Sequence, residues 1–162
     1  MIRYGIVGMG AMGREHAENL RHIEGASVVA FSDPDQGSRD AGTAQLGTEV
    51  RVFSDQNEML ASGLIDVAII ATPNFTHVDV LEDALKTDLH IFIEKPLCTT
   101  IDDCLKDADL VLHLTEWKIY REIDPVALKS KVSGAIIIDG RNALDRDLWI
   151  KAGWNFRALG RA

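Results

Sequence analysis

The sequence has little cysteine, no long apolar run and no excess of basic charge. Its two cysteines, Cys98 and Cys104, are too few for a disulfide framework and are typical of reduced thiols, so we expect a cytoplasmic protein. The apolar runs near residues 67–71 and 135–138 are far shorter than the about 20 residues of a membrane span. The first residues, MIRYGIVGMG, lack the apolar core of a signal peptide. Seventeen basic against 25 acidic residues argue against nucleic-acid partners and anionic membranes.

The remaining composition is that of an ordinary globular protein. Its 162 residues are 46% apolar and 26% charged, which is typical of one domain. Charge is uneven: residues 1–106 carry 8 basic and 17 acidic side chains, whereas residues 107–162 carry 9 and 8, together with all three tryptophans. This shift indicates either two pieces of different ancestry or one domain with a distinct C-terminal part. Because no Gly/Ser- or Pro-rich linker marks the junction, we expect both parts to pack on one sheet as a single domain.

Short apolar runs alternate with helical patterns along the chain. The run VAIIA at 67–71 is apolar on both faces, as in a buried parallel strand. The alternation predicts an α/β, Rossmann-like fold with a doubly wound, mostly parallel sheet of about eight strands and with the last helices on one face. The expected strand order is 3-2-1-4-5-6-7-8, or a variant in which the strands of the tail pair differently. The predicted strands are Arg3–Val7, Ser27–Ser32, Arg51–Phe53, Asp66–Ala71, His90–Ile93, Asp109–Leu114, Ala135–Ile138 and Phe156–Leu159. The predicted helices are Ala11–His22, Gln36–Leu46, Asn57–Ser62, His77–Lys86, Thr100–Lys106, Asp124–Lys131 and Leu144–Ala152.

A glycine-rich motif follows the first predicted strand and opens the first predicted helix. The motif, G-x-G-x-x-G, is formed by Gly8, Met9, Gly10, Ala11, Met12 and Gly13. Its first glycine permits a tight turn, its second lets the backbone approach a pyrophosphate, and its third allows the helix to pack closely on the strand. The N–H groups at the helix start then face the phosphates. The alternative is a structural turn that binds nothing.

An acidic residue stands where the ribose of a dinucleotide is expected. Asp33 ends the second predicted strand, 20 residues beyond Gly13, and a carboxylate there accepts hydrogen bonds from the ribose diol. Its charge would repel the 2′-phosphate of NADP, and Pro34 and Asp35 follow it without an arginine. The sequence therefore predicts NAD rather than NADP as the cofactor.

Two polar segments follow later strands, at the sheet edge where open α/β sheets bind ligands. The first segment contains Thr72, Pro73, Asn74, Thr76 and His77. Asn74 and His77 either orient the nicotinamide end of the cofactor or belong to the start of a helix capped by Asn74 or Thr76.

The second polar segment is Glu94-Lys95-Pro96. Because Lys95 precedes a proline, its backbone is extended and its ammonium is displayed at the strand end. A single lysine is more often a solvated surface charge, but the place of Lys95 beside the predicted crevice favours a function. No metal site is predicted.

Residues 1–106 resemble the N-terminal domain of the Gfo/Idh/MocA (glucose–fructose oxidoreductase / inositol dehydrogenase) family. The resemblance rests on GIVGMGAMG, the strand end at Asp33, ATPNFTH and IEKP. It implies NAD(P) binding by Gly8, Gly10, Gly13 and Asp33, and nicotinamide-side contacts from Thr72, Asn74 and His77. It also implies a catalytic or substrate-contacting role for Lys95, whose bond to Pro96 is often cis in that family. Family members continue into an α+β substrate domain, for which we expect no room in these 162 residues.

Residues 107–162 resemble the C-terminal end of the UDP-glucose / UDP-N-acetylhexosamine 6-dehydrogenase family. The matching segments are Ala108–Val111, Thr115–Trp117, Asp139–Asn142 and Gly153–Arg161. The resemblance implies half of a UDP-binding domain in which Arg141 contacts a UDP-sugar. Alternatively, Arg141 pairs with Asp139 or Asp145. The glycine-rich segment with that family's catalytic cysteine is missing, so we expect Cys98 and Cys104 to be ordinary core or surface thiols.

Three functions stay open on the sequence. The first is an NAD-binding protein of sugar-oxidoreductase ancestry, acting on a sugar, a polyol or a UDP-sugar, with little or no catalysis alone. Catalysis needs a substrate held against the nicotinamide with a base nearby, and the surface enclosing Lys95 would have to come from a partner chain or a homodimer. The second is a UDP- or nucleotide-sugar-binding module that uses Arg141. The third is a natural or engineered chimera that binds nothing.

Overall fold

The protein is described by a computed structural model that covers residues 1–160. It divides into two compact units, the first ending at Thr99 and the second beginning at Thr100, shortly before the predicted boundary after residue 106. Arg161, which the resemblance of the tail included, lies outside the described residues. Among residues 1–160 there is no helix whose length and apolar character would suit a membrane span.

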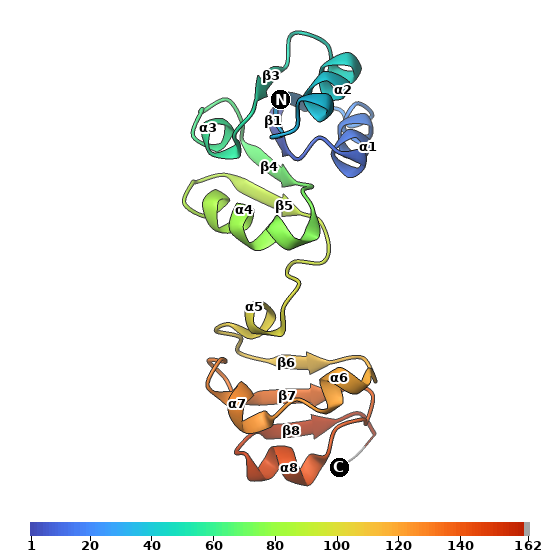
Figure 1. Cartoon of the computed structure of the whole chain (residues 1–162), viewed down its shortest axis with the longest axis vertical. Helices are drawn as coiled ribbons and strands as arrows, with labels where there is room; N and C mark the ends of the chain where they lie inside the picture. The colour runs from blue at the N-terminus through green and yellow to red at the C-terminus, as the bar shows by residue number, and fades with distance from the viewer. Residues whose placement is uncertain (161–162) are drawn as a thin grey trace. The chain divides into compact units, whose positions relative to one another are not determined.

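The first unit alternates strands and helices, with all its strands parallel (Figure 1). Its elements are β1 (Ile2–Val7), α1 (Ala11–Leu20), β2 (Ala26–Ser32), α2 (Gln36–Leu46), β3 (Arg51–Phe53), α3 (Gln56–Leu60), β4 (Val67–Ile70), the short 3₁₀ helix η1 (Asn74–Thr76), α4 (His77–Ala84) and β5 (His90–Ile93). The strands lie in the order β3-β2-β1-β4-β5. The strand order therefore reverses between β1 and β4, and in such sheets this point marks a ligand-binding crevice at the carboxyl ends of the strands.

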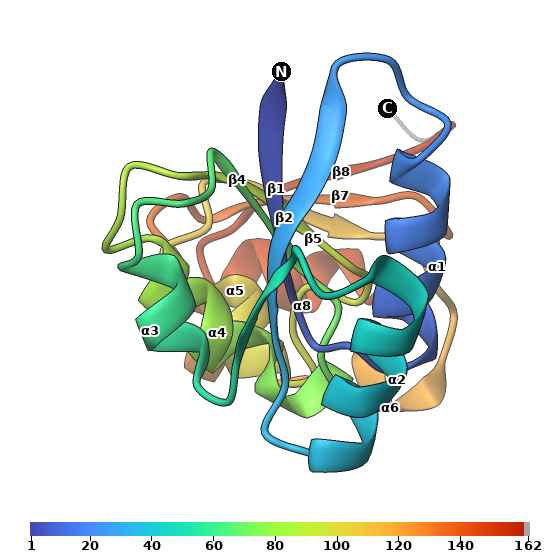
Figure 2. The same cartoon turned by 90° about the horizontal axis from the view of Figure 1, so that it is seen from above.

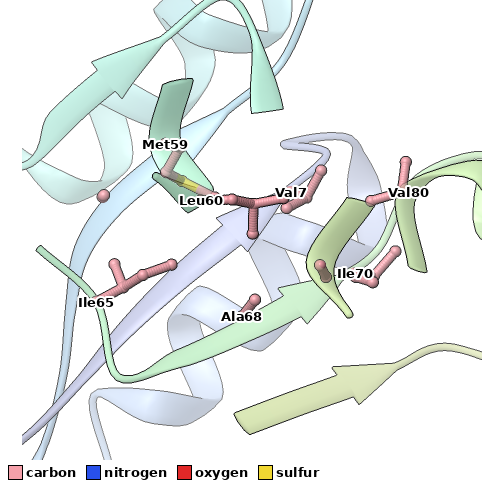
Figure 3. Packing of buried hydrophobic residues seen from close by; sticks show 9 residues of the cluster. Val7, Met59, Leu60, Ile65, Ala68, Ile70 and Val80 are labelled. Atoms are coloured by element: carbon pink, nitrogen blue, oxygen red, sulfur yellow. The ribbon is translucent and has the colours of Figure 1, made fainter. Parts of the chain in front are cut away.

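Helices cover both faces of this sheet because its strands are apolar on both sides (Figure 2). Successive side chains of a strand point to opposite faces. Ile6 of β1 packs in one cluster with Leu20 of α1. Its neighbour Val7 belongs to the other cluster, with Met59 of α3 and Val80 of α4 (Figure 3). The predicted doubly wound arrangement is confirmed for these five strands.

The second unit contains a sheet of three parallel strands in the order β6-β7-β8. Its elements are α5 (Ile101–Leu105), β6 (Val111–His113), α6 (Lys118–Arg121), α7 (Pro125–Lys129), β7 (Ile136–Asp139), α8 (Arg146–Lys151) and β8 (Asn155–Ala158). Helices α5, α7 and α8 contribute Leu105, Leu128 and Trp149 to one core cluster, as expected for helices on one face. Trp149 meets Trp154 edge to face, with ring centroids 5.0 Å apart. The unit therefore has a core of its own.

The prediction of one continuous eight-stranded sheet is wrong, because the strands form sheets of five and three. The α/β class, the parallel pairing and the eight strands are confirmed. An apolar pattern identifies a strand, but every strand edge offers the same backbone N–H and C=O groups, so the pattern does not select the neighbour. β5 pairs with β4, and β6 pairs with β7. The pattern also fails to predict α6 and η1, each about one turn long.

A buried aspartate joins the carboxyl ends of β6 and β7. Asp139 is fully buried and accepts hydrogen bonds from the N–H groups of Arg141 at 3.0 Å and Leu144 at 2.9 Å. The Nδ1 atom of His113 lies 3.1 Å from the same carboxylate. Burial raises the pKa of Asp139, but these hydrogen bonds outweigh burial and lower the pKa below its usual value. The ionised carboxylate is therefore the form that the second unit stabilises.

We expect Asp139→Asn to lower the free energy of unfolding of the second unit by about 3 kcal/mol at pH 7, because it breaks a buried charged network. A lowered folded-state pKa stabilises the fold above the unfolded value of about 3.9, and this contribution is lost as the pH falls through the folded-state pKa. The difference between wild type and variant should therefore shrink in acid. All three tryptophans lie in this unit, so urea unfolding followed by tryptophan fluorescence measures it. The exposed Asp147→Asn is the control, and equal midpoints for Asp139→Asn and wild type at pH 7 would contradict the expectation.

Candidate functional site

The glycine motif forms a tight turn between β1 and α1. Gly8 has a φ of 90°, in the region that favours glycine, and its N–H donates to the carbonyl of Ser32 at 2.8 Å. A Cβ on Gly8 would lie 2.8 Å from the carbonyl oxygen of Ala71 on the next strand end, and a Cβ on Gly13 would lie 1.9 Å from the carbonyl oxygen of Gly8. These two glycines therefore let backbone pack on backbone.

Gly10 faces open space. Within residues 1–160, no atom outside its own neighbourhood lies within 4 Å of the place where its Cβ would be. Gly10 is the N-cap of α1, and the first turn of this helix carries no acidic side chain. Unsatisfied N–H groups and the positive end of the helix dipole suit an anion at such a position. The residues therefore fit a pyrophosphate, which is the group that the motif predicts.

Asp33 connects the end of β2 to the glycine turn. Its Oδ2 accepts a hydrogen bond from the N–H of Met9 at 2.7 Å, and its Oδ1 accepts one from the N–H of Asp35 at 2.9 Å. The residue is largely buried, so its carboxylate is held in one orientation beside the turn. A carboxylate has about four acceptor positions, and two are used here. Capacity for the hydroxyl groups of a ribose remains.

The structure adds an arginine that the sequence reasoning missed. Arg39, in the first part of α2, turns back and donates from Nη1 to the carbonyl oxygens of Asp33 at 2.7 Å and Pro34 at 2.8 Å. The prediction of NAD rested partly on the absence of arginine directly after Asp33, and the fold brings one there from six residues along. Arg39 lies in the first turn of α2, and this position in the sequence could have indicated that its side chain reaches back to Asp33. Its guanidinium is engaged by backbone carbonyls.

The segment after β4 splits into exposed and buried residues. Asn74 and Phe75 are exposed in η1, and the hydroxyl of Thr76 lies 2.9 Å from that of Thr72. His77 is fully buried as the first residue of α4. Its Nδ1 lies 2.7 Å from the carbonyl oxygen of Pro96, and its Nε2 lies 3.0 Å from that of Thr72. Both ring nitrogens of His77 therefore face backbone carbonyls, and its contact with the cofactor stays a prediction. Thr76 is the N-cap of α4 and His77 lies in its first turn, as the alternative predicted, although the Thr76 side chain makes no capping hydrogen bond.

The Glu94-Lys95-Pro96 segment leaves the sheet at β5. Its Lys95–Pro96 bond is cis, as the family resemblance implied, and Lys95 is exposed. Glu94 accepts a hydrogen bond at 2.7 Å from Nε2 of His16, a residue of α1 that the sequence reasoning did not select. This hydrogen bond lowers the pKa of Glu94. The segments after β1, β2, β4 and β5 thus carry the predicted residues of the first unit.

Arg141 belongs to the second unit, at the turn after β7. Its backbone N–H donates to Asp139, and its side chain binds Glu116 through Nε at 3.0 Å and Nη2 at 2.9 Å. The alternative pairing with Asp139 therefore involves the backbone of Arg141, whereas the side-chain partner is Glu116. Cys98 is half-buried and Cys104 is exposed.

The first unit has the arrangement of a dinucleotide site, and the comparison with known proteins agrees. Residues 2–116 match the Gfo/Idh/MocA family, described as an oxidoreductase family with an NAD-binding Rossmann fold. The chain belongs to this family. Inositol 2-dehydrogenase of Rubrobacter xylanophilus is 35% identical to it over 143 residues, which cover 83% of this chain and 41% of that protein. The predicted family of residues 1–106 and its cofactor NAD are confirmed at this level.

Two solved structures are similar to this member of the Gfo/Idh/MocA family. Myo-inositol dehydrogenase from Lactobacillus casei, in complex with NAD(H) and myo-inositol, has a TM-score of 0.59 and 35% identity, covering 62% of this chain and 30% of that one. The WlbA dehydrogenase from Bordetella pertussis, in complex with NADH and UDP-GlcNAcA, has a TM-score of 0.58 and 31% identity, covering 63% and 31%. The chain thus spans well under half the length of these relatives. The resemblance of residues 107–162 to UDP-sugar dehydrogenases stays a prediction.

We expect Gly13→Ala to destabilise the first unit by about 3 kcal/mol, because its Cβ would overlap the carbonyl of Gly8. This value is at the upper end of the range for substitutions that add atoms to a closely packed place. Gly10→Ala is the matched control, since its Cβ would enter open space. Thermal unfolding followed by far-UV circular dichroism compares the two variants. A melting temperature of Gly13→Ala equal to that of Gly10→Ala would contradict the close approach of α1 to β1.

Proposed function

We propose that the first unit binds NAD across the carboxyl ends of β1 and β4 and serves as the cofactor domain of an oxidoreductase. The observation that carries this proposal is the open space at Gly10, at the start of α1, between two glycines that have no room for a side chain. Membership of a family with an NAD-binding Rossmann fold supports it.

Each part of the site has a proposed role. The backbone N–H groups of the glycine turn and the first turn of α1 bind the pyrophosphate, and the carboxylate of Asp33 accepts the ribose hydroxyls. The segment after β4 and the Glu94-Lys95 turn lie toward the nicotinamide. The residues assigned to the cofactor are Gly8, Gly10, Ala11, Met12, Gly13, Asp33, Thr72, Pro73, Asn74, Glu94 and Lys95, with His77 acting through its loops.

We propose a polyol or sugar as the substrate of the complete oxidoreductase, because the relatives include inositol dehydrogenases. NAD, when bound, supplies the hydride acceptor. Lys95 is the proposed group that contacts the substrate hydroxyl and, in its neutral amine form, accepts the hydroxyl proton, since its side chain is exposed at the end of β5. Because the substrate must also be held against the nicotinamide, we expect these 162 residues alone to bind NAD with little or no turnover.

Isothermal titration of the whole chain with NAD and NADP tests the cofactor. We expect NAD to bind more tightly than NADP, because the Asp33 carboxylate repels a 2′-phosphate. Gly10→Val should weaken NAD binding at least about 100-fold, or about 2.8 kcal/mol, by filling the space for the pyrophosphate. Arg141→Ala, in the other unit, is the control and should bind NAD as the wild type does. Wild type without measurable NAD binding, or Gly10→Val with unchanged affinity, would refute the proposal.

A second candidate function is a UDP-sugar site in the second unit. It is favoured by the position of Arg141 after β7, where its side chain pairs with Glu116. Glu116 is followed in sequence by Trp117, whose ring stacks on that of Tyr120 with the ring centroids 6.1 Å apart. An arginine suits a diphosphate and an aromatic ring suits a base. Titration with UDP decides: binding that Arg141→Ala abolishes and Gly10→Val leaves intact would support this function, and no binding would remove it.

A further inference from the structure

The segment that carries Lys95 leaves the sheet at an edge strand. β5 pairs with β4 on one side, and the N–H of Glu94 continues this ladder to the carbonyl of Ile70 at 3.0 Å. An edge strand has a backbone neighbour on one side, so its last residues depend on side-chain contacts for a fixed position. The contacts that reach Glu94, Lys95 and Pro96 therefore decide where the Lys95 ammonium stands.

On the face covered by α4, the contact is made by His77. The ring of this fully buried residue lies between two loops, with Nδ1 toward the carbonyl of Pro96 at 2.7 Å and Nε2 toward that of Thr72 at 3.0 Å. Carbonyl oxygens only accept, so a doubly protonated ring donates to both and a neutral ring to one of them. One side chain of α4 thus joins the turns that follow β4 and β5.

On the opposite face, covered by α1, the contact is made by His16. Its Nε2 lies 2.7 Å from Oε1 of Glu94, and the two side chains are 18% and 17% exposed. The ring of Phe92 meets the imidazole edge to face at 5.4 Å. His16 belongs to the helix that starts at Gly10, so the Glu94 carboxylate is connected to the same helix that faces the pyrophosphate position.

We propose that His16 and His77 are positioning residues that hold Glu94-Lys95-Pro96 from the two faces of the sheet and so fix Lys95 relative to the nicotinamide half of NAD. This inference rests on the proposed function of the first unit. It assigns both histidines an effect on the nicotinamide half of the ligand and none on the adenosine half, whose contacts lie at the glycine turn and Asp33.

The experiment compares two ligands that differ in the nicotinamide. NADH and ADP-ribose share the adenosine, the pyrophosphate and the second ribose, and only NADH carries the ring. Isothermal titration of the whole chain with both ligands is run on wild type, His77→Leu, His77→Gln and His16→Ala. The shift of the emission maximum of bound NADH gives a second, spectroscopic readout of the nicotinamide surroundings. His90→Leu and His22→Ala, which replace exposed histidines in β5 and after α1, are the matched controls.

We expect His77→Leu to raise the Kd for NADH about 10-fold, the equivalent of about 1.4 kcal/mol, and to leave the Kd for ADP-ribose within about 2-fold. His77→Gln keeps an N–H donor and should lose less. His16→Ala should likewise weaken the binding of NADH and not that of ADP-ribose. Because His16 is partly exposed, this variant tests the inference if His77→Leu does not fold. In each variant the emission maximum of bound NADH should move toward that of free NADH.

Three results would overturn the inference. Equal losses for NADH and ADP-ribose would mean that the histidines support the unit as a whole, and unchanged affinities would mean that the segment is fixed by other contacts. Losses of NADH affinity of similar size in His90→Leu or His22→Ala would mean that the effect is not specific to His16 and His77. A wild-type chain that binds neither ligand would instead refute the proposed function, and the inference would fall with it.

Discussion

The first unit depends on the approach of α1 to the end of β1. The helix meets the strand through backbone atoms, because a Cβ on Gly13 would come within 1.9 Å of the Gly8 carbonyl oxygen. This approach sets the direction in which α1 begins, and with it the place of the N–H groups beside Gly10. The close packing at Gly8 and Gly13, where a Cβ would clash, thus leaves the open space at Gly10. Close packing and ligand access are divided among three glycines within one turn.

Around this turn, a small set of buried or half-buried polar side chains connects the strand ends. Asp33 joins β2 to the glycine turn through Met9, and His16 joins α1 to Glu94. His77 lies between the carbonyls of Thr72 and Pro96. Buried polar groups are costly unless paired, so each of these contacts favours one arrangement of its loops over others. The carboxyl edge of the sheet is therefore organised by polar contacts, whereas its two faces are held by apolar clusters.

The second unit follows the same α/β pattern with a different centre. Its core contains Trp149 and Trp154, packed in one apolar cluster. At the end of β7, the carboxylate of Asp139 accepts hydrogen bonds from the backbone of the following turn. The family match ends at residue 116, within this unit, and the solved relatives cover about three fifths of the chain. The Gfo/Idh/MocA membership therefore explains the first unit most completely.

The sequence by itself determined the features that are local. The eight strands, the glycine turn, the position of Asp33 and the family of the first unit follow from short motifs and apolar periodicity, which act over a few neighbouring residues. The tertiary structure decided what joins distant residues: two sheets in place of one, and the pairing of His16 with Glu94, 78 residues away. It also placed the ring of His77 between the carbonyls of Pro96 and Thr72, and folded Arg39 back onto Asp33. Hydrogen-bonding groups are alike all along a chain, and only the folded arrangement selects which of them meet.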